Sequence, residues 1–89
     1  TPGFEFSGIV KSTGKSVSSF HPGDKVLGVN LFHSYASQVV AKPAFLFPLP
    51  EKMSFEEGAA FPAVMLTAYH ALFQNVVVRE GMTALIHSA

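Results

Sequence analysis

Four histidines, at positions 21, 33, 70 and 87, are the residues of this sequence that most often serve as metal ligands in proteins. No two of them lie four residues apart, the spacing that places two ligands on one face of a helix, and no cysteine is present to complete a thiolate site. We therefore expect no metal site in this chain. The lack of cysteine also excludes disulfides and a nucleophilic thiol.

The tripeptide Gly14-Lys15-Ser16 has the order that ends a phosphate-binding loop, which also requires a glycine five residues before Gly14. That place is held by Ile9, and the nearest glycine is Gly8. The residues after Ser16 do not have a helical pattern, so we interpret the segment as a solvated turn. The sequence also contains no Gly-x-Ser-x-Gly elbow, so a hydrolase serine is not expected.

Thr67 lies on the polar face of a predicted helix, together with His70 and Gln74. The opposite face is an apolar stripe at helical spacing, made of Phe61, Val64, Met65, Ala68, Leu72 and Phe73. A threonine on the wet face of a helix is usually only solvated, but its hydroxyl can also donate or accept a hydrogen bond from a ligand. The helical pattern leaves both interpretations open.

Short strands that would hold these side chains in place are predicted at residues 4–10, 25–29 and 35–41. A type II turn is predicted at residues 21–24, where Pro22 presets φ and Gly23 supplies the positive φ that the third position requires. Prolines restrict residues 44–50 to an edge segment or an extended linker. Several short strands joined by such turns predict a small β-barrel or a part of one.

The pattern becomes helical at Ser54, which forms a capping box with Glu57 and predicts a short helix. Pro62 fits the first turn of a second helix. Residues 83–88 are short and apolar, as a buried parallel strand is. Such a strand needs a neighbour, so we expect it to be the first of a sheet that continues after residue 89, and we interpret both chain ends as those of a fragment.

The composition is that of a folded protein, with 48% apolar and 13% charged residues. Net charge is zero and the lysines are scattered, so binding to nucleic acid is not expected. No apolar run approaches the roughly 20 residues of a membrane span. A free-standing barrel module that binds a partner remains an alternative, although the unpaired strand predicted at residues 83–88 argues against it.

Several short motifs, taken together and in order, resemble the medium-chain dehydrogenase/reductase superfamily, in the branch that contains quinone oxidoreductases, zeta-crystallin and VAT-1. These motifs are residues 2–8 (PGFEFSG), 20–26 (FHPGDKV), 49–50 (LP), 54–62 (SFEEGAAFP), 67–69 (TAY) and 85–89 (LIHSA). The resemblance implies a mixed α/β fragment. Its parts would be a chaperonin-10-like (GroES-like) partial β-barrel at residues 1–53, a helical connection at 54–80, and the first strand of a Rossmann NADP-binding domain at 81–89.

The resemblance also implies an activity, which is hydride transfer from NADPH to a quinone or an activated alkene. In the zinc-dependent relatives a histidine ligand precedes the glutamate of the first motif, whereas Phe4 stands there in this chain, so a zinc-free enzyme is implied. Thr67 matches a residue beside the nicotinamide, and Ser88 and Ala89 are expected near the cofactor at the end of the last strand. No catalytic residue is assigned. The loop at residues 30–35 is expected to border the substrate cleft.

Family members further suggest a cytoplasmic protein that forms a homodimer and acts on a small molecule, and the 89-residue chain alone is expected to be inactive. The alternative is a non-catalytic homologue that serves as a structural or membrane-associated interaction protein.

Overall fold

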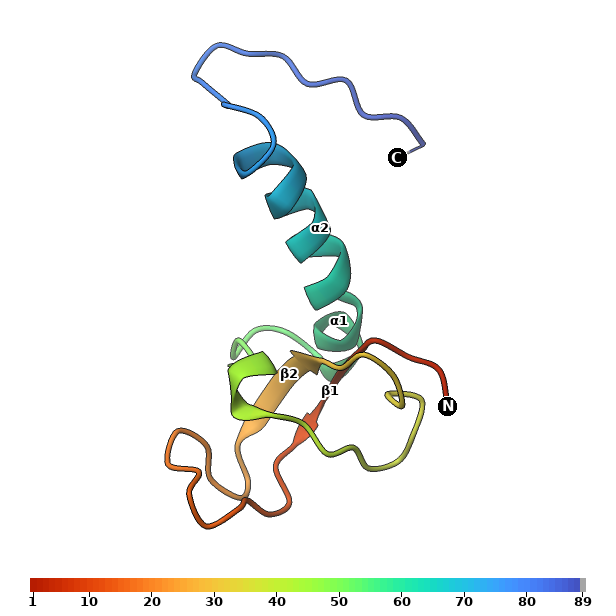
Figure 1. Ribbon diagram of the computed structural model, residues 1–89, viewed down its shortest axis with the longest axis vertical. Helices are drawn as coiled ribbons and strands as arrows, with labels where there is room; N and C mark the ends of the chain where they lie inside the picture. Colours follow the sequence, from red (N-terminus) through yellow and green to blue (C-terminus); the bar gives the residue numbers. More distant parts are fainter. Residues whose placement is uncertain (89) are drawn as a thin grey trace.

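The computed structural model describes residues 1–88 and contains a small antiparallel sheet with two helices after it (Figure 1). The elements in chain order are β1 (Glu5–Ile9), β2 (Lys25–Val29), the short 3-10 helix η1 (Pro43–Phe45), β3 (Leu46–Pro48), α1 (Phe55–Ala60) and α2 (Pro62–Phe73). The sheet and α1 form the body, and α2 rises from it as a stalk toward the C-terminal tail (Figure 1). The molecule is accordingly elongated, at 48 × 27 × 25 Å.

The sheet has the strand order β1-β2-β3, with Glu5 opposite Val29 and Leu27 opposite Phe47. The predicted strand at residues 25–29 is confirmed, and β3 is the edge strand that the prolines around it require. The predicted turn before β2 is also confirmed. Gly23 has a φ of 95°, and the Asp24 N–H donates to the His21 carbonyl at 3.0 Å.

Val26 and Leu27 of β2 form the core, with 4% and 5% of their surfaces exposed. Helix α1 packs directly on β1 at Gly58, where a Cβ atom would lie 3.2 Å from the Ser7 Cβ and 2.5 Å from the Leu49 Cδ1. This close approach favours a glycine, because a larger side chain would press against the Ser7 Cβ and displace the Leu49 side chain.

Both predicted helices are confirmed, and so are the residues that begin them. The Glu57 N–H donates to the Ser54 hydroxyl, and the Ser54 N–H donates to the Glu57 carboxylate, which completes the capping box. Pro62 is in the first turn of α2. None of the helices in residues 1–88 has the length and the apolar content needed to cross a bilayer.

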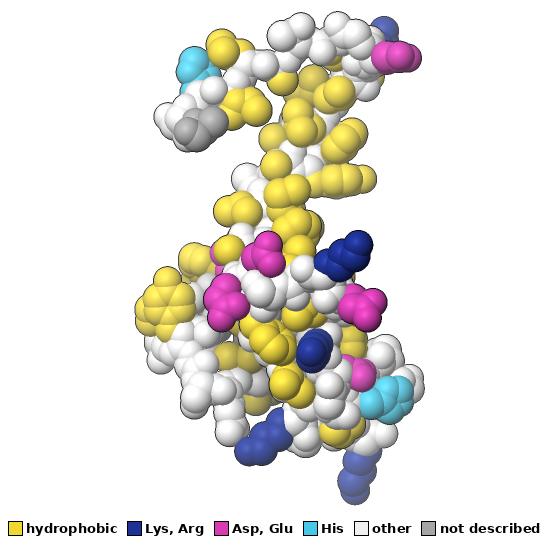
Figure 2. Space-filling model, turned by 180° about the vertical axis from the view of Figure 1, so that it is seen from behind, with side chains coloured by type: hydrophobic (Ala, Val, Ile, Leu, Met, Phe, Trp, Pro, Cys, Tyr) yellow, Lys and Arg dark blue, Asp and Glu magenta, His cyan; other side chains and the backbone are white. Residues whose placement is uncertain are grey.

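The apolar stripe predicted on α2 is present in sequence but is not covered by residues 1–88. Only Pro62 of this helix is buried, whereas Val64 and Phe73 are each 59% exposed. Figure 2 shows apolar side chains along the whole stalk. Leu66 and Tyr69, outside the predicted stripe, are exposed as well, so α2 is apolar on more than one side.

Two predicted strands are not formed. Residues 35–38 are bends and residues 39–41 have no regular structure. Of the strand predicted at residues 83–88, residues 83–86 are non-helical backbone without a strand partner in the described part of the chain, and residues 87–88 form a turn. A strand exists only where a neighbour accepts and donates its backbone hydrogen bonds, and residues 1–88 provide none for the tail. The assignment of residues 81–89 to a Rossmann domain therefore stays a prediction.

Candidate functional site

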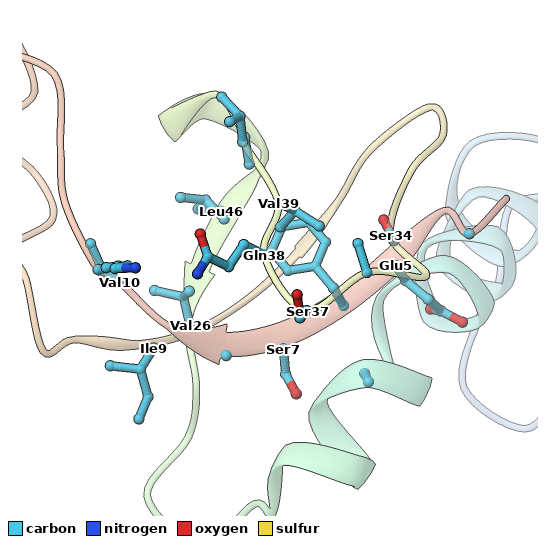
Figure 3. Close-up of a pocket in the computed structure, with 18 of the residues that line it drawn as sticks. Glu5, Ser7, Ile9, Val10, Val26, Ser34, Ser37, Gln38, Val39 and Leu46 are labelled. Carbon is cyan, nitrogen blue, oxygen red and sulfur yellow. The ribbon is translucent and has the colours of Figure 1, made fainter. Parts of the chain in front are cut away.

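An open pocket of about 1210 Å³ runs along β1, between the strand and the loop of residues 34–41 (Figure 3). Val26 and Leu46 form its floor on the other two strands, and Gln38 and Val39 form part of the loop wall. Ser34 and Tyr35, from the loop expected to border the substrate cleft, also line this pocket.

Two polar side chains of β1 connect this pocket to the helices. The Ser7 hydroxyl donates to the carbonyl of Phe55 at the start of α1. The Glu5 carboxylate accepts a hydrogen bond of 2.8 Å from the backbone N–H of Ala63 in the first turn of α2. In Figure 3 both side chains extend from β1 toward the helical segments. β1 thus binds one helix through a hydroxyl and the other through a carboxylate.

Thr67 is exposed on α2, one turn after Ala63. Its hydroxyl donates to the Ala63 carbonyl at 2.8 Å, so its hydrogen is already used within the helix. The oxygen keeps its acceptor lone pairs, and it can therefore receive a hydrogen bond from an amide or hydroxyl donor of a bound molecule.

The other two predicted cofactor residues do not gather around Thr67 in this structure. The tail arches away from the C-terminal end of α2, and its described residues stand apart from the helix (Figure 1). Ser88 is exposed and has a φ of 56°, in the left-handed region, instead of ending a buried strand. Ala89 lies outside the described residues. The roles assigned to Thr67, Ser88 and Ala89 stay predictions.

Ionisable groups in the described chain are dispersed. Residues 1–88 contain no cluster of three or more histidine, aspartate or glutamate side chains that would hold a metal ion. The pKa of Glu57 lies below its ordinary value because its carboxylate accepts hydrogen bonds from the backbone N–H and then the hydroxyl of Ser54. This carboxylate belongs to the helix cap and does not face the pocket.

Comparison with known proteins assigns the fold to a family. The alcohol dehydrogenase GroES-like domain matches residues 1–51, more than half of the chain. The chain belongs to the medium-chain dehydrogenase/reductase superfamily, in its quinone oxidoreductase and VAT-1 branch. The three-stranded sheet is accordingly part of a GroES-like barrel, and the resemblance seen in the sequence motifs is confirmed.

Two curated relatives of this superfamily match nearly the whole chain. The mouse (Mus musculus) synaptic vesicle membrane protein VAT-1 homolog-like is 44% identical over 88 residues, or 99% of this chain. The quinone oxidoreductase of the pig (Sus scrofa) is 41% identical over 90 aligned positions and matches all of the chain. The chain spans 21% of the first relative's length and 27% of the second's, so their activities as whole proteins are not those of this chain by default.

The crystal structure of the human synaptic vesicle membrane protein VAT-1 homolog-like protein superposes with a TM-score of 0.87 at 43% identity. The match covers 91% of this chain and 26% of that one.

Sequence reasoning missed Glu5 and Ser7, which alternate with apolar residues on β1 and were interpreted only as the polar face of a strand. One signal was available for Glu5. Phe61 stands at the N-cap of α2 and has no side-chain acceptor, so the helix needs an acceptor from elsewhere in the fold.

Proposed function

We propose that this chain is part of a zinc-independent oxidoreductase that transfers a hydride from NADPH to a quinone or an activated alkene. The 41% identity to a quinone oxidoreductase over the entire chain is the observation that carries the proposal. Membership in the superfamily supports an oxidoreductase activity. We propose in addition that the cofactor is NADPH, that a hydride is transferred, and that the substrate is a quinone or an activated alkene.

NADPH supplies the hydride when it is bound, and the protein supplies position and electrostatics. Thr67 is suited to a place beside the nicotinamide. Its hydroxyl hydrogen is used in the bond to the Ala63 carbonyl, whereas its oxygen can still accept a hydrogen bond. The carboxamide of a nicotinamide carries two N–H donors, and one of them complements this oxygen. Ser88 and Ala89 would approach the cofactor only if the tail adopts the strand that its sequence predicts.

The identity of Phe4 supports a zinc-independent reaction. Phe4 stands immediately before Glu5 in the PGFEFSG motif, at the place where the zinc-dependent relatives have a histidine ligand. A phenyl ring has no lone pair to bind zinc. The chain also has no cysteine to bind a structural zinc ion. Substrate reduction would therefore depend on hydrogen-bond donors and acceptors of the protein, and not on a zinc ion bound at position 4 or by cysteines of this chain.

The test is a turnover assay on the full-length polypeptide that carries this sequence. We expect NADPH oxidation that depends on an added naphthoquinone or alkyl enone and that persists after dialysis against a zinc chelator. Loss of activity on chelation, restored by zinc, would contradict the zinc-independent part of the proposal. No turnover with either substrate class would contradict the reaction.

A second candidate function is a non-catalytic, membrane-associated interaction protein. The observation that favours it is the 44% identity to a relative named as a synaptic vesicle membrane protein. Co-sedimentation with phosphatidylserine-containing vesicles, together with no detectable NADPH binding, would favour this function over the reductase.

A further inference from the structure

Helix α2 is attached to the body of the molecule through its first turn. Pro62 is buried and Ala63 is half-buried, whereas residues 64–73 are exposed in the described structure. Thr67 lies four residues beyond Ala63, which is about 6 Å along the helix axis. Its position relative to the sheet therefore depends on how firmly the first turn is held.

The first turn has no cap of its own. Phe61 occupies the N-cap position without a side-chain hydrogen bond, and Pro62 has no N–H to offer. The N–H of Ala63 is thus the first backbone donor of the helix, and it points at the Glu5 carboxylate at 2.8 Å. A negative charge at a helix N-terminus is also favoured by the helix dipole.

Both backbone polar groups of Ala63 form hydrogen bonds with side chains. Its N–H donates to Glu5 of β1, and its carbonyl accepts from the Thr67 hydroxyl at 2.8 Å. The carboxylate on the strand and the hydroxyl on the helix are therefore connected through one residue. Ser7, two residues after Glu5 on β1, contacts the other helix, because its hydroxyl donates to the Phe55 carbonyl at the start of α1.

We infer that Glu5 is a positioning residue for the cofactor: its bond to the Ala63 N–H fixes the first turn of α2 on β1 and so sets the place of the Thr67 oxygen. The inference rests on the proposed function, in which that oxygen accepts a hydrogen bond from the nicotinamide carboxamide. Glu5 itself touches neither cofactor nor substrate in this role.

A double-mutant cycle for NADPH affinity separates this role from a general loss of stability. The full-length polypeptide is prepared as wild type, Glu5→Ala, Thr67→Val and the double variant, and the NADPH Kd is measured by nucleotide fluorescence. We expect Thr67→Val to raise the Kd about tenfold, as the loss of one polar hydrogen bond does. Glu5→Ala should raise it severalfold, and the double variant should bind no more weakly than Thr67→Val.

Additive effects of the two substitutions, or an unchanged Kd in Glu5→Ala, would overturn the inference while leaving the proposed function intact. No NADPH binding by the wild type, or an unchanged Kd in Thr67→Val, would overturn the assigned role of Thr67 and the inference with it. Glu51→Ala is the matched control, because Glu51 is an exposed glutamate in the turn before α1, and its Kd should equal that of the wild type.

Hydrogen exchange at the Ala63 amide gives a second readout that requires no cofactor. The bond to Glu5 should protect this amide, and Glu5→Ala should speed its exchange about tenfold while amides in β2 keep their wild-type rates. An unchanged rate would contradict the bond on which the inference depends. If Glu5→Ala does not fold, Glu5→Gln keeps an acceptor oxygen at the same place and should show a smaller change in both measurements.

Discussion

Gly58 of α1 rests on Ser7 of β1, so closely that a Cβ atom on the glycine would lie 3.2 Å from the serine Cβ. This contact brings the start of α1 within reach of the Ser7 hydroxyl, which binds the Phe55 carbonyl. Helix α2 follows after a single residue, so the same contact also places its first turn over Glu5.

Gly58→Ala should therefore destabilise the chain even though alanine is the better helix former. The added methyl group would lie 3.2 Å from the Ser7 Cβ, so the strand and helix must shift slightly apart, and the Leu49 side chain, whose Cδ1 would lie at 2.5 Å, must turn away. Such overpacking costs about 1–3 kcal/mol, against a gain in helix propensity of about 1 kcal/mol. We expect a net loss of about 1 kcal/mol in the urea unfolding free energy.

Gly14→Ala is the matched control for that substitution. Gly14 lies in an exposed loop, and the nearest atom to an added Cβ is a Val17 methyl group at 3.9 Å, which is ordinary contact. Its unfolding free energy should stay within about 0.5 kcal/mol of the wild type. Equal losses in the two variants would contradict the close packing of α1 on β1.

Gly23→Ala tests whether a position needs glycine because of its backbone conformation and not because of close packing. A Cβ at this position meets no atom within 4 Å, but the backbone φ is 95°. The cost is therefore backbone strain alone, about 1 kcal/mol, and Gly23→Asn should lose less because asparagine tolerates the left-handed region better. Thermal unfolding of both variants measures this order, and an alanine variant as stable as the wild type would contradict the turn.

The capping box makes the stability of α1 depend on pH. The folded-state pKa of Glu57 is lowered by the hydrogen bonds from Ser54, so the ionised form stabilises the fold. This contribution is fully present above the unfolded pKa of about 4.3 and is lost as the pH falls through the lower folded-state value.

Helicity measured by circular dichroism should therefore decrease at acid pH in the wild type. Glu57→Gln keeps an acceptor but cannot ionise, so this component of the pH dependence should be absent from it. Ser54→Ala, which removes the hydroxyl acceptor, should cost about 1 kcal/mol at neutral pH. A Glu57→Gln variant with the full wild-type acid transition would contradict the assignment.

Local signals in the sequence predicted the elements that depend on local chemistry. The Pro22-Gly23 turn and the capping box at Ser54 and Glu57 are each determined by residues within five positions, and each is formed. The strand at residues 25–29 has a local pattern that predicts it, and it forms because β1 and β3 pair with it. The superfamily was also evident from the sequence, because its motifs lie in order along the chain, and two of its members match nearly all of it.

Features that depend on distant partners were not predictable in the same way. The bond between Glu5 and Ala63 spans 58 residues, and an alternating strand pattern does not say what its polar face contacts. The strand predicted at residues 83–88 has the right composition but no neighbour in the described chain, so composition alone does not form it. The apolar side chains of α2 likewise indicate burial that residues 1–88 do not provide.

NADPH binding to the full-length polypeptide, compared between the wild type and Thr67→Val, tests whether α2 holds the nicotinamide through the Thr67 oxygen. Valine keeps the shape of threonine and removes the oxygen that we propose accepts a hydrogen bond from the carboxamide. We predict saturable NADPH binding by the wild type, weakened about tenfold in the variant with an unchanged circular dichroism spectrum. Equal affinities in the two proteins, or no binding in either, would contradict the proposed cofactor role of Thr67.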